Sequence, residues 1–180
     1  MRNKLVLSLA CLSMQNIFAI PGQVTIVSQS ETANFYTLNP QGQERAAALA
    51  YQLGTANNIE TNEFGPPVAI FASRGSITVL KTATPLSSLL NIPIHVGFSP
   101  LHPEEIVNYI FNNSAYDDEN VMIFWDAAGI PSLIGAFGFQ PVTSVAPYIT
   151  FILQFPMASS YVTRQLQLLF YNAPTVLPPY

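Results

Sequence analysis

The feature that most constrains the fold of this chain is a regular alternation of short apolar runs with longer helical segments. The first run, Val24–Val27, is continuous and β-branched, as in a strand that is buried on both faces of a parallel sheet. The segment after it opens a helix at Leu38-Asn39-Pro40, and its small apolar residues recur on one face up to Gly54. Such alternation predicts an α/β sheet with crossover helices. We expect further strands at 67–72, 92–96 (an edge strand) and 121–125, and further helices at 76–90, with a break or kink at Pro85, at 103–111 and at 129–136.

The C-terminal part of the chain departs from this alternation. Residues 148–155 and 162–171 are two strand-like runs separated by a short loop, so we expect a β-hairpin added to a mostly parallel sheet. Residues 172–180 contain three prolines and are expected to form an extended tail. A chain of 180 residues suggests a single domain, which we place at residues 20–180.

The first nineteen residues have the pattern of a secretory signal peptide. Arg2 and Lys4 precede a short apolar run at 5–12, and a small residue, Ala19, stands where such peptides are cleaved. The run is too short to span a bilayer. The alternatives are a buried N-terminal strand or helix, and a lipoprotein signal at Cys11. The pattern therefore predicts export to the periplasm or beyond the cell.

Cleavage there would leave a chain with few charges and no cysteine. Cys11 is the single cysteine of the sequence, so disulfides and cysteine metal sites are excluded from the remaining chain. Arg2 and Lys4 would also be lost, which changes the formal net charge from −4 to −6. Four remaining basic residues cannot neutralise a row of phosphates, and this disfavours nucleic-acid binding. No second apolar run is long enough to form a transmembrane helix.

Several short segments occur in an order that matches one known family. Ile26-Val27 ends a strand, Glu31-Thr32 closes the polar loop after it, and Leu38-x-Pro-x-Gly-x-x-x-Ala46 opens a helix. Together they resemble the opening of the histidine phosphatase superfamily, the phosphoglycerate mutase-like proteins, in which a strand leads into Arg-His-Gly-Glu or Arg-His-Ala-Glu. Later segments are similar to that family in the same order: Phe71-Ala72-Ser73 with Thr82-Ala83, Val121 to Pro131, and Leu168 to Asn172.

The resemblance implies a three-layer αβα fold and, in active members, a phosphotransfer site. There a histidine attacks phosphorus, while two arginines and a second histidine hold the phosphoryl oxygens. In this chain Gln29 stands for the nucleophile, Ser28 and Thr78 for the arginines, and Asp126 for the second histidine. A glutamine amide cannot accept a phosphoryl group, and Asp126 would repel a phosphate dianion. The pocket that the resemblance implies is formed by Ser28, Gln29, Ser30, Glu31, Thr78 and Asp126.

Other residues could compensate for these losses. Arg74 could turn into the pocket, or it could be a surface residue at a strand end. His102 could act as an acid or base, or it could simply lie exposed at a helix start. A nucleophilic Ser28 beside Asp126 would lack the histidine that makes such a pair effective. Asp117–Asn120 could hold calcium through oxygen ligands, but it lacks the glycine and the bidentate glutamate of a dedicated calcium loop, which favours a solvated turn. We therefore expect no metal site and no cofactor.

Three functions are compatible with the sequence. The first is an exported, catalytically inactive histidine phosphatase-like domain that binds a protein or a small ligand, neutral and polar or cationic. The second is a phosphatase or other hydrolase with a rebuilt active site, acting on an envelope or extracellular substrate. The third is an interaction module that acts through its surface. We favour the first, because the reactive groups are replaced in an otherwise preserved frame; the ligand, the partner and the oligomeric state are not specified by the sequence.

Overall fold

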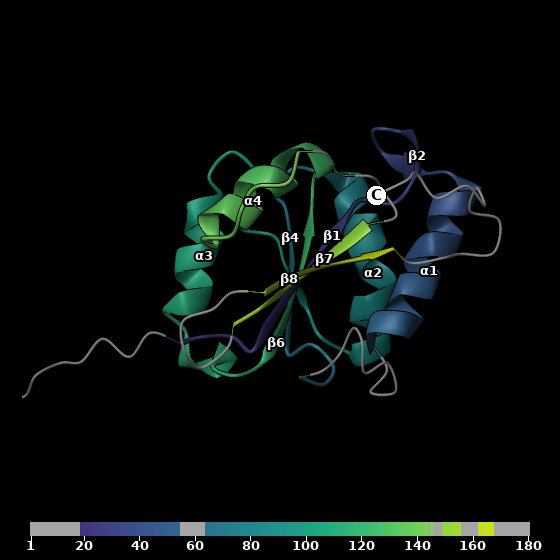
Figure 1. Ribbon diagram of the computed structural model, residues 1–180. Helices are drawn as coiled ribbons and strands as arrows, with labels where there is room; N and C mark the ends of the chain where they lie inside the picture. The colour runs from purple at the N-terminus through teal and green to yellow at the C-terminus, as the bar shows by residue number, and fades with distance from the viewer. Residues whose placement is uncertain (1–18, 55–63, 144, 146–148, 156–161, 168–180) are drawn as a thin grey trace, which may run out of the picture.

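The centre of the fold is a six-stranded sheet in the order β5-β4-β6-β1-β7-β8 (Figure 1). The computed structural model describes residues 19–54, 64–143, 145, 149–155 and 162–167. Strands β5, β4, β6 and β1 are mutually parallel, whereas β7 pairs antiparallel with β1 and β8 pairs antiparallel with β7. Their bounds are Gln23–Ser28 (β1), Ala69–Ala72 (β4), Ile94–His95 (β5), Asn120–Trp125 (β6), Ile149–Gln154 (β7) and Val162–Gln167 (β8).

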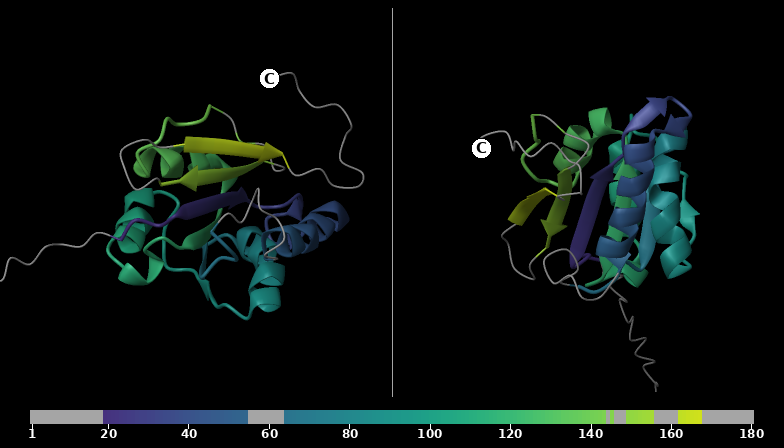
Figure 2. Two further views of the ribbon diagram at one scale, coloured as in Figure 1. Left: turned by 60° about the horizontal axis from the view of Figure 1, so that its bottom comes forward. Right: turned by 90° about the vertical axis from the view of Figure 1, so that its right-hand side faces the viewer.

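Helices cover both faces of this sheet. Helices α1 (Pro40–Gly54) and α2 (Ile77–Leu90) lie against one face, and α3 (Pro103–Phe111) and α4 (Ile130–Ala136) lie against the other (Figure 1). Two short 3₁₀ helices, Ser114–Tyr116 and Ala127–Gly129, flank β6. The expected α/β architecture, mostly parallel with a C-terminal hairpin, is confirmed. Figure 2 shows β7 and β8 side by side beyond β1. The expected tail lies outside the described residues.

Side chains of the central strands alternate between two apolar cores. Val24 and Ile26 of β1 belong to the core beneath α3 and α4, whereas Val27 belongs to the core beneath α1 and α2. On β6, Trp125 and Phe124 divide in the same way, and neither is exposed to solvent. Burial of one such side chain contributes about 1.5–3 kcal/mol to folding. The continuous apolar runs in the sequence therefore mark strands that are covered on both faces.

The helices begin at residues that satisfy their free backbone N–H groups. Asn39 precedes α1, and its Oδ1 accepts a hydrogen bond from the Gly42 N–H at 2.8 Å. Ser76 is the N-cap of α2. Of the break or kink predicted at Pro85, the break is wrong, because α2 continues through this residue to Leu90. Proline removes one backbone donor, and buried side chains before and after it hold the adjoining turns of α2 against the sheet.

Two loops are more ordered than the sequence predicted. The segment after β1 was expected to be a polar loop, yet β2 (Thr32–Asn34) and β3 (Thr37–Leu38) pair there as an antiparallel hairpin. Its turn is fixed by the Asn34 side chain, whose Oδ1 accepts from the Tyr36 N–H at 2.9 Å. The second is the segment before the acidic turn at Asp117, which forms the 3₁₀ helix Ser114–Tyr116, and Tyr116 is buried there with its ring edge-on to Phe71.

The N-terminal end of the described chain runs beside the loop that precedes β6. Ala19 is buried, and its N–H donates to the Phe111 carbonyl at 2.8 Å. The Ile20 N–H donates to Asp117 Oδ1 at 2.9 Å, and the Asp118 N–H donates back to the Ile20 carbonyl. Within the described residues, none of the helices combines the length and the apolar character that crossing a membrane requires.

Gly42 generates the first prediction, because α1 passes close to the loop after β1 at this residue. A Cβ atom added to Gly42 would lie 2.1 Å from the Glu31 carbonyl oxygen, which is backbone and itself accepts from the Asn39 N–H at 3.0 Å. We expect Gly42→Ala to lower the free energy of unfolding by about 1–3 kcal/mol, as overpacking does. Gly97→Ala is the control, since a Cβ there meets nothing within 4 Å. Urea unfolding measures both, and equal midpoints for the two variants would contradict the packing argument.

Candidate functional site

The carboxyl ends of the three central parallel strands meet at one edge of the sheet. Ser28 at the end of β1 pairs with Trp125 at the end of β6, and Ala72 at the end of β4 pairs with Phe124. The residues that follow these strands therefore emerge side by side. In open α/β sheets, ligands bind outside this edge.

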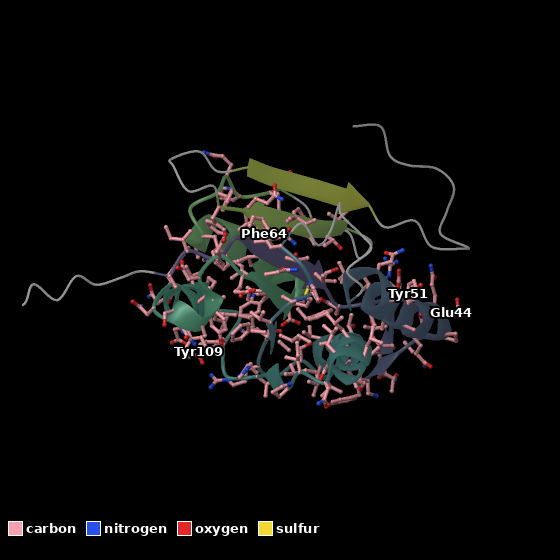
Figure 3. All side chains as sticks on the ribbon, turned by 90° about the horizontal axis from the view of Figure 1, so that it is seen from below. Glu44, Tyr51, Phe64 and Tyr109 are labelled. Atoms are coloured by element: carbon pink, nitrogen blue, oxygen red, sulfur yellow. The ribbon has the colours of Figure 1, made fainter. Side chains whose placement is uncertain are left out.

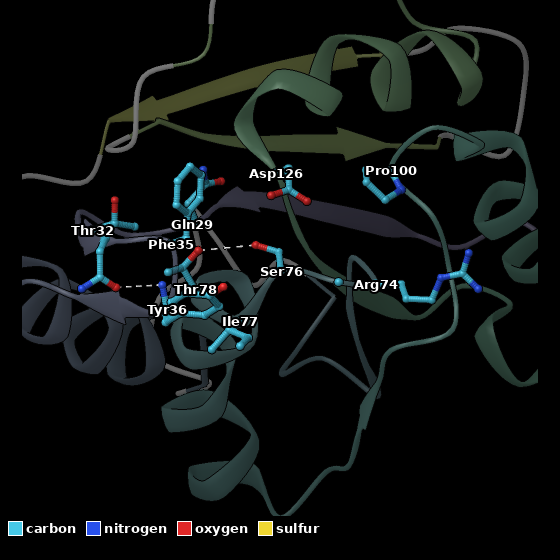
Figure 4. A pocket seen from close by; sticks show the side chains of 12 residues that line it. Gln29, Thr32, Phe35, Tyr36, Arg74, Ser76, Ile77, Thr78, Pro100 and Asp126 are labelled. Atoms are coloured by element: carbon cyan, nitrogen blue, oxygen red, sulfur yellow. Dashed lines mark hydrogen bonds between the residues drawn. The ribbon is translucent and has the colours of Figure 1, made fainter.

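A pocket of about 850 Å³ opens at this edge (Figure 4). Its volume is in the range of small-molecule sites. The lining comes from the loop after β1, the β2–β3 hairpin, the segment that leads into α2 and its first turn, the segment before α3, and the residue after β6. The lining residues are Gln29, Thr32, Asn34, Phe35, Tyr36, Arg74, Gly75, Ser76, Ile77, Thr78, Pro100 and Asp126.

Two side chains at the strand ends are held in place by hydrogen bonds. Gln29 Oε1 accepts from the Ala127 N–H at 2.9 Å, so this amide is tied to the segment after β6. Asp126 Oδ2 accepts from the Ser73 hydroxyl at 2.7 Å. Both residues stand where the family resemblance places reactive histidines. Here they form cross-links between the ends of neighbouring strands.

The loop after β1 is also tied to α2. The Ser30 N–H donates to Thr82 Oγ1 at 2.9 Å, and the Thr82 hydroxyl in turn donates to the Thr78 carbonyl at 2.8 Å. Thr78 is buried, and its Oγ1 lies 3.4 Å from Ser76 Oγ. The hydroxyls of Thr78 and Thr82 are therefore both in contact with other groups of the fold, and Thr78 is the position that aligns with the family's second arginine.

Glu31 is held away from the pocket by an ion pair. Arg45 of α1 is 4% exposed, and its Nε donates to Glu31 Oε2 at 2.7 Å while its terminal nitrogen contacts Oε1. Burial alone would raise the pKa of Glu31, but the hydrogen bond and positive charge of Arg45 outweigh it and hold this pKa below its ordinary value. No role was predicted for Arg45, because nothing in the sequence around it indicates that it pairs with Glu31.

The residues predicted from the sequence therefore divide into two groups. Gln29, Thr78, Asp126 and Arg74 line the pocket. Ser28 is buried in β1, and Ser30 and Glu31 lie beside the pocket without lining it; the Ser30 hydroxyl is buried and has no hydrogen-bond partner within the described residues.

The two possible compensating residues do not reach Asp126. The Arg74 side chain is exposed and extends away from Asp126 (Figure 4). His102 lies outside the pocket lining, exposed at the start of α3, with its Nδ1 3.4 Å from Glu104 Oε1.

The pocket offers hydrogen-bonding groups, one carboxylate, one arginine and two aromatic rings. Among the described residues that line it there is no histidine, lysine or cysteine. In the part of the chain that the structure describes, no cluster of three or more His, Cys, Asp or Glu side chains could hold a metal ion. Phe35 and Tyr36 were missed by the sequence analysis. The sequence feature that could have indicated them is a pair of adjacent aromatic residues inside a polar loop.

Solved structures of similar shape come from one superfamily. The mycobacterial glucosyl-3-phosphoglycerate phosphatase in complex with VO3 has a TM-score of 0.57 and 12% identity, covering 79% of this chain and 96% of its own. The α-ribazole phosphatase from Shigella flexneri has a TM-score of 0.59 and 11% identity, covering 81% and 96%. The protein histidine phosphatase SixA, in complex with tungstate, has a TM-score of 0.57 and 12% identity, covering 81% and 96%. No protein-family model and no curated protein sequence matches the chain.

These similarities define the class of fold. The chain has the α/β fold of the histidine phosphatase superfamily, the phosphoglycerate mutase-like fold, over most of its length. The resemblance in the sequence segments and the similarity of the whole structures thus agree. At this identity the likeness concerns the fold, and the chemistry has to be argued from the pocket itself.

The Glu31–Arg45 pair generates a pH-dependent prediction. A carboxylate whose pKa is lowered on folding stabilises the protein above its unfolded pKa, and that stabilisation is lost as the pH falls through the folded pKa. We therefore expect the stability difference between wild type and Glu31→Gln to be full at pH 7 and to shrink below about pH 4.5. Urea unfolding at pH 7, 5 and 3 measures it. Glu44→Gln, which changes an exposed acid on α1 beside Arg45, is the control, and a Glu31→Gln difference that does not change with pH would contradict the assignment.

Proposed function

We propose that this protein is a non-catalytic binding protein built on the histidine phosphatase fold. Its pocket takes a small ligand, neutral and polar or cationic, in place of a phosphate ester. The observation that carries the proposal is the state of Gln29. It stands at the position that aligns with the phosphoryl-accepting histidine, and its side-chain oxygen is already bonded to the Ala127 N–H. An amide in that position supports the fold and does not supply a nucleophile.

The electrostatics of the pocket support the same conclusion. A phosphate dianion is held in proteins by cationic side chains and by N–H groups directed at its oxygens. Here the carboxylate of Asp126 faces the pocket, and the guanidinium of Arg74 is directed away from it (Figure 4). A dianion close to Asp126 would be repelled.

A hydrolase with a rebuilt site is the second candidate, and the described geometry gives it less support. It would need Ser28, Glu31, Asp126 and His102 to converge. Ser28 is buried within β1, Glu31 is paired with Arg45, and His102 lies exposed at the start of α3. Only Asp126 of these four lines the pocket.

The proposal predicts that the purified protein has no phosphomonoesterase activity. We expect turnover of p-nitrophenyl phosphate, with and without Mg²⁺, to equal the buffer blank, because the position that aligns with the phosphoryl-accepting histidine holds the Gln29 amide, which is not a nucleophile. Asp126→Ala and Arg74→Ala are assayed in parallel. Turnover by the wild-type protein that disappears in either variant would overturn the proposal and would identify a rebuilt active site.

We further propose that the chain is exported and cleaved after Ala19. The N-terminal sequence pattern supports this, as does the short distance of 2.9 Å between the Ile20 nitrogen and Asp117 Oδ1. Hydrolysis of the Ala19–Ile20 bond would turn that N–H donor into an ammonium group next to a carboxylate, and so strengthen an existing contact.

Expression of the complete chain in a Gram-negative host tests the export proposal. We expect the protein in the periplasmic extract to have an intact mass that begins at Ile20. Its stability should fall in Asp117→Asn, and Asp118→Asn, which changes the neighbouring side chain, is the control. A mature protein that retains Met1, or that begins ahead of Ala19, would contradict cleavage at this bond.

A further inference from the structure

Part of the pocket lining is aromatic and exposed. Phe35 and Tyr36 occupy the turn of the β2–β3 hairpin, where they are 91% and 66% exposed, and both line the pocket. The Asn34 side chain holds this turn through the Tyr36 N–H. Two adjacent aromatic rings beside a pocket offer apolar surface to a ligand, and the negative faces of the rings attract cations.

The second feature is a carboxylate without a cation. Asp126 Oδ2 accepts from the Ser73 hydroxyl, whereas no hydrogen bond of Oδ1 is found among the described residues. Within the same residues, no Lys, Arg or His nitrogen lies within 4.0 Å of Asp126. Asp126 is half-buried, so its charge is partly removed from water with only a hydroxyl to compensate.

The aromatic rings of Phe35 and Tyr36 and the carboxylate of Asp126 together indicate which class of ligand the pocket binds. This inference rests on the proposed binding function. We propose that the pocket binds an organic monocation, a primary or quaternary alkylammonium compound. Its ammonium group lies against Asp126, and its alkyl groups contact Phe35 and Tyr36. A carboxylate combined with aromatic faces is the set of groups that recognises such ions. The volume of about 850 Å³ leaves room for a larger substituent, which the polar lining can hydrogen-bond.

Two features of the same pocket would favour an anion, and each is weakened by its geometry. The N-terminus of α2 attracts negative charge, but Ser76 caps it by accepting from the Val79 N–H at 3.5 Å. Arg74 extends away from the pocket centre (Figure 4). Inorganic phosphate is therefore the appropriate opposing probe.

Isothermal titration calorimetry on the full chain tests the inference. The probes are choline and phenethylamine, their neutral counterparts 3,3-dimethylbutan-1-ol and phenethyl alcohol, and inorganic phosphate. We expect at least one cation to bind about tenfold more tightly than its neutral counterpart, a difference of 1.4 kcal/mol, because the positive charge of either ammonium group is attracted to the Asp126 carboxylate and to the aromatic faces.

Variants assign the contacts. Asp126→Asn keeps the shape and removes the charge, and we expect it to weaken cation binding about tenfold while leaving the neutral compounds unchanged. Phe35→Ala should weaken cation binding about two- to fivefold, as the loss of an exposed cation–π contact does. Tyr51→Ala is the matched control, because Tyr51 of α1 is an exposed aromatic side chain (Figure 3), 70% accessible, and does not line the pocket.

The outcomes distinguish this inference from the proposed function. Equal affinity for cations and neutral counterparts, no binding of either cation at millimolar concentration, or full binding in Asp126→Asn would overturn the inference. If phosphatase turnover is absent at the same time, the non-catalytic function stands and only the ligand class is wrong. Tight phosphate binding together with turnover of p-nitrophenyl phosphate would overturn both.

Discussion

The pairing of three parallel strands determines almost everything else in this structure. Because β4, β6 and β1 end in register, the residues after them are brought to one edge although they are far apart in the sequence. The hydrogen bonds of Gln29 and Asp126 link these strand ends directly. A pocket at this edge is thus a property of the fold, and its chemistry is a property of a few exchangeable side chains.

The residues that the family resemblance aligns with reactive groups connect neighbouring segments of the fold. Gln29 joins the end of β1 to the segment after β6, and Asp126 joins that segment to Ser73 after β4. On the other side of the loop, the Glu31–Arg45 pair fastens the β1 loop to α1. A buried arginine that loses its partner is costly, so this pair constrains the loop path strongly. Side chains other than histidine and arginine at these aligned positions are therefore physically compatible with the shape of the fold.

The sequence predicted the sheet well because its strands are buried on both faces and are therefore apolar throughout. The observed strands β1 and β6 differ from the predicted bounds, Val24–Val27 and Val121–Trp125, by no more than one residue at either end. The β2–β3 hairpin was missed because it is short and exposed, and its stability depends on Asn34 and on tertiary contacts. Pro85 was overestimated as a helix breaker because packing on both sides outweighs one lost donor. Of the site, alignment with the family placed Gln29, Thr78 and Asp126 at the pocket, whereas Phe35 and Tyr36 required the hairpin geometry to be known.

The short strand β5 has a consequence for how the molecule meets other chains. β5 is the outermost strand on its side of the sheet and contains only two residues, Ile94 and His95. An exposed strand edge offers a row of unpaired backbone groups on which a strand of another chain can add, and a two-residue edge offers very few. A strand of another chain that paired with β5 would therefore gain almost no hydrogen bonds. This protects a chain of low charge against edge-to-edge aggregation.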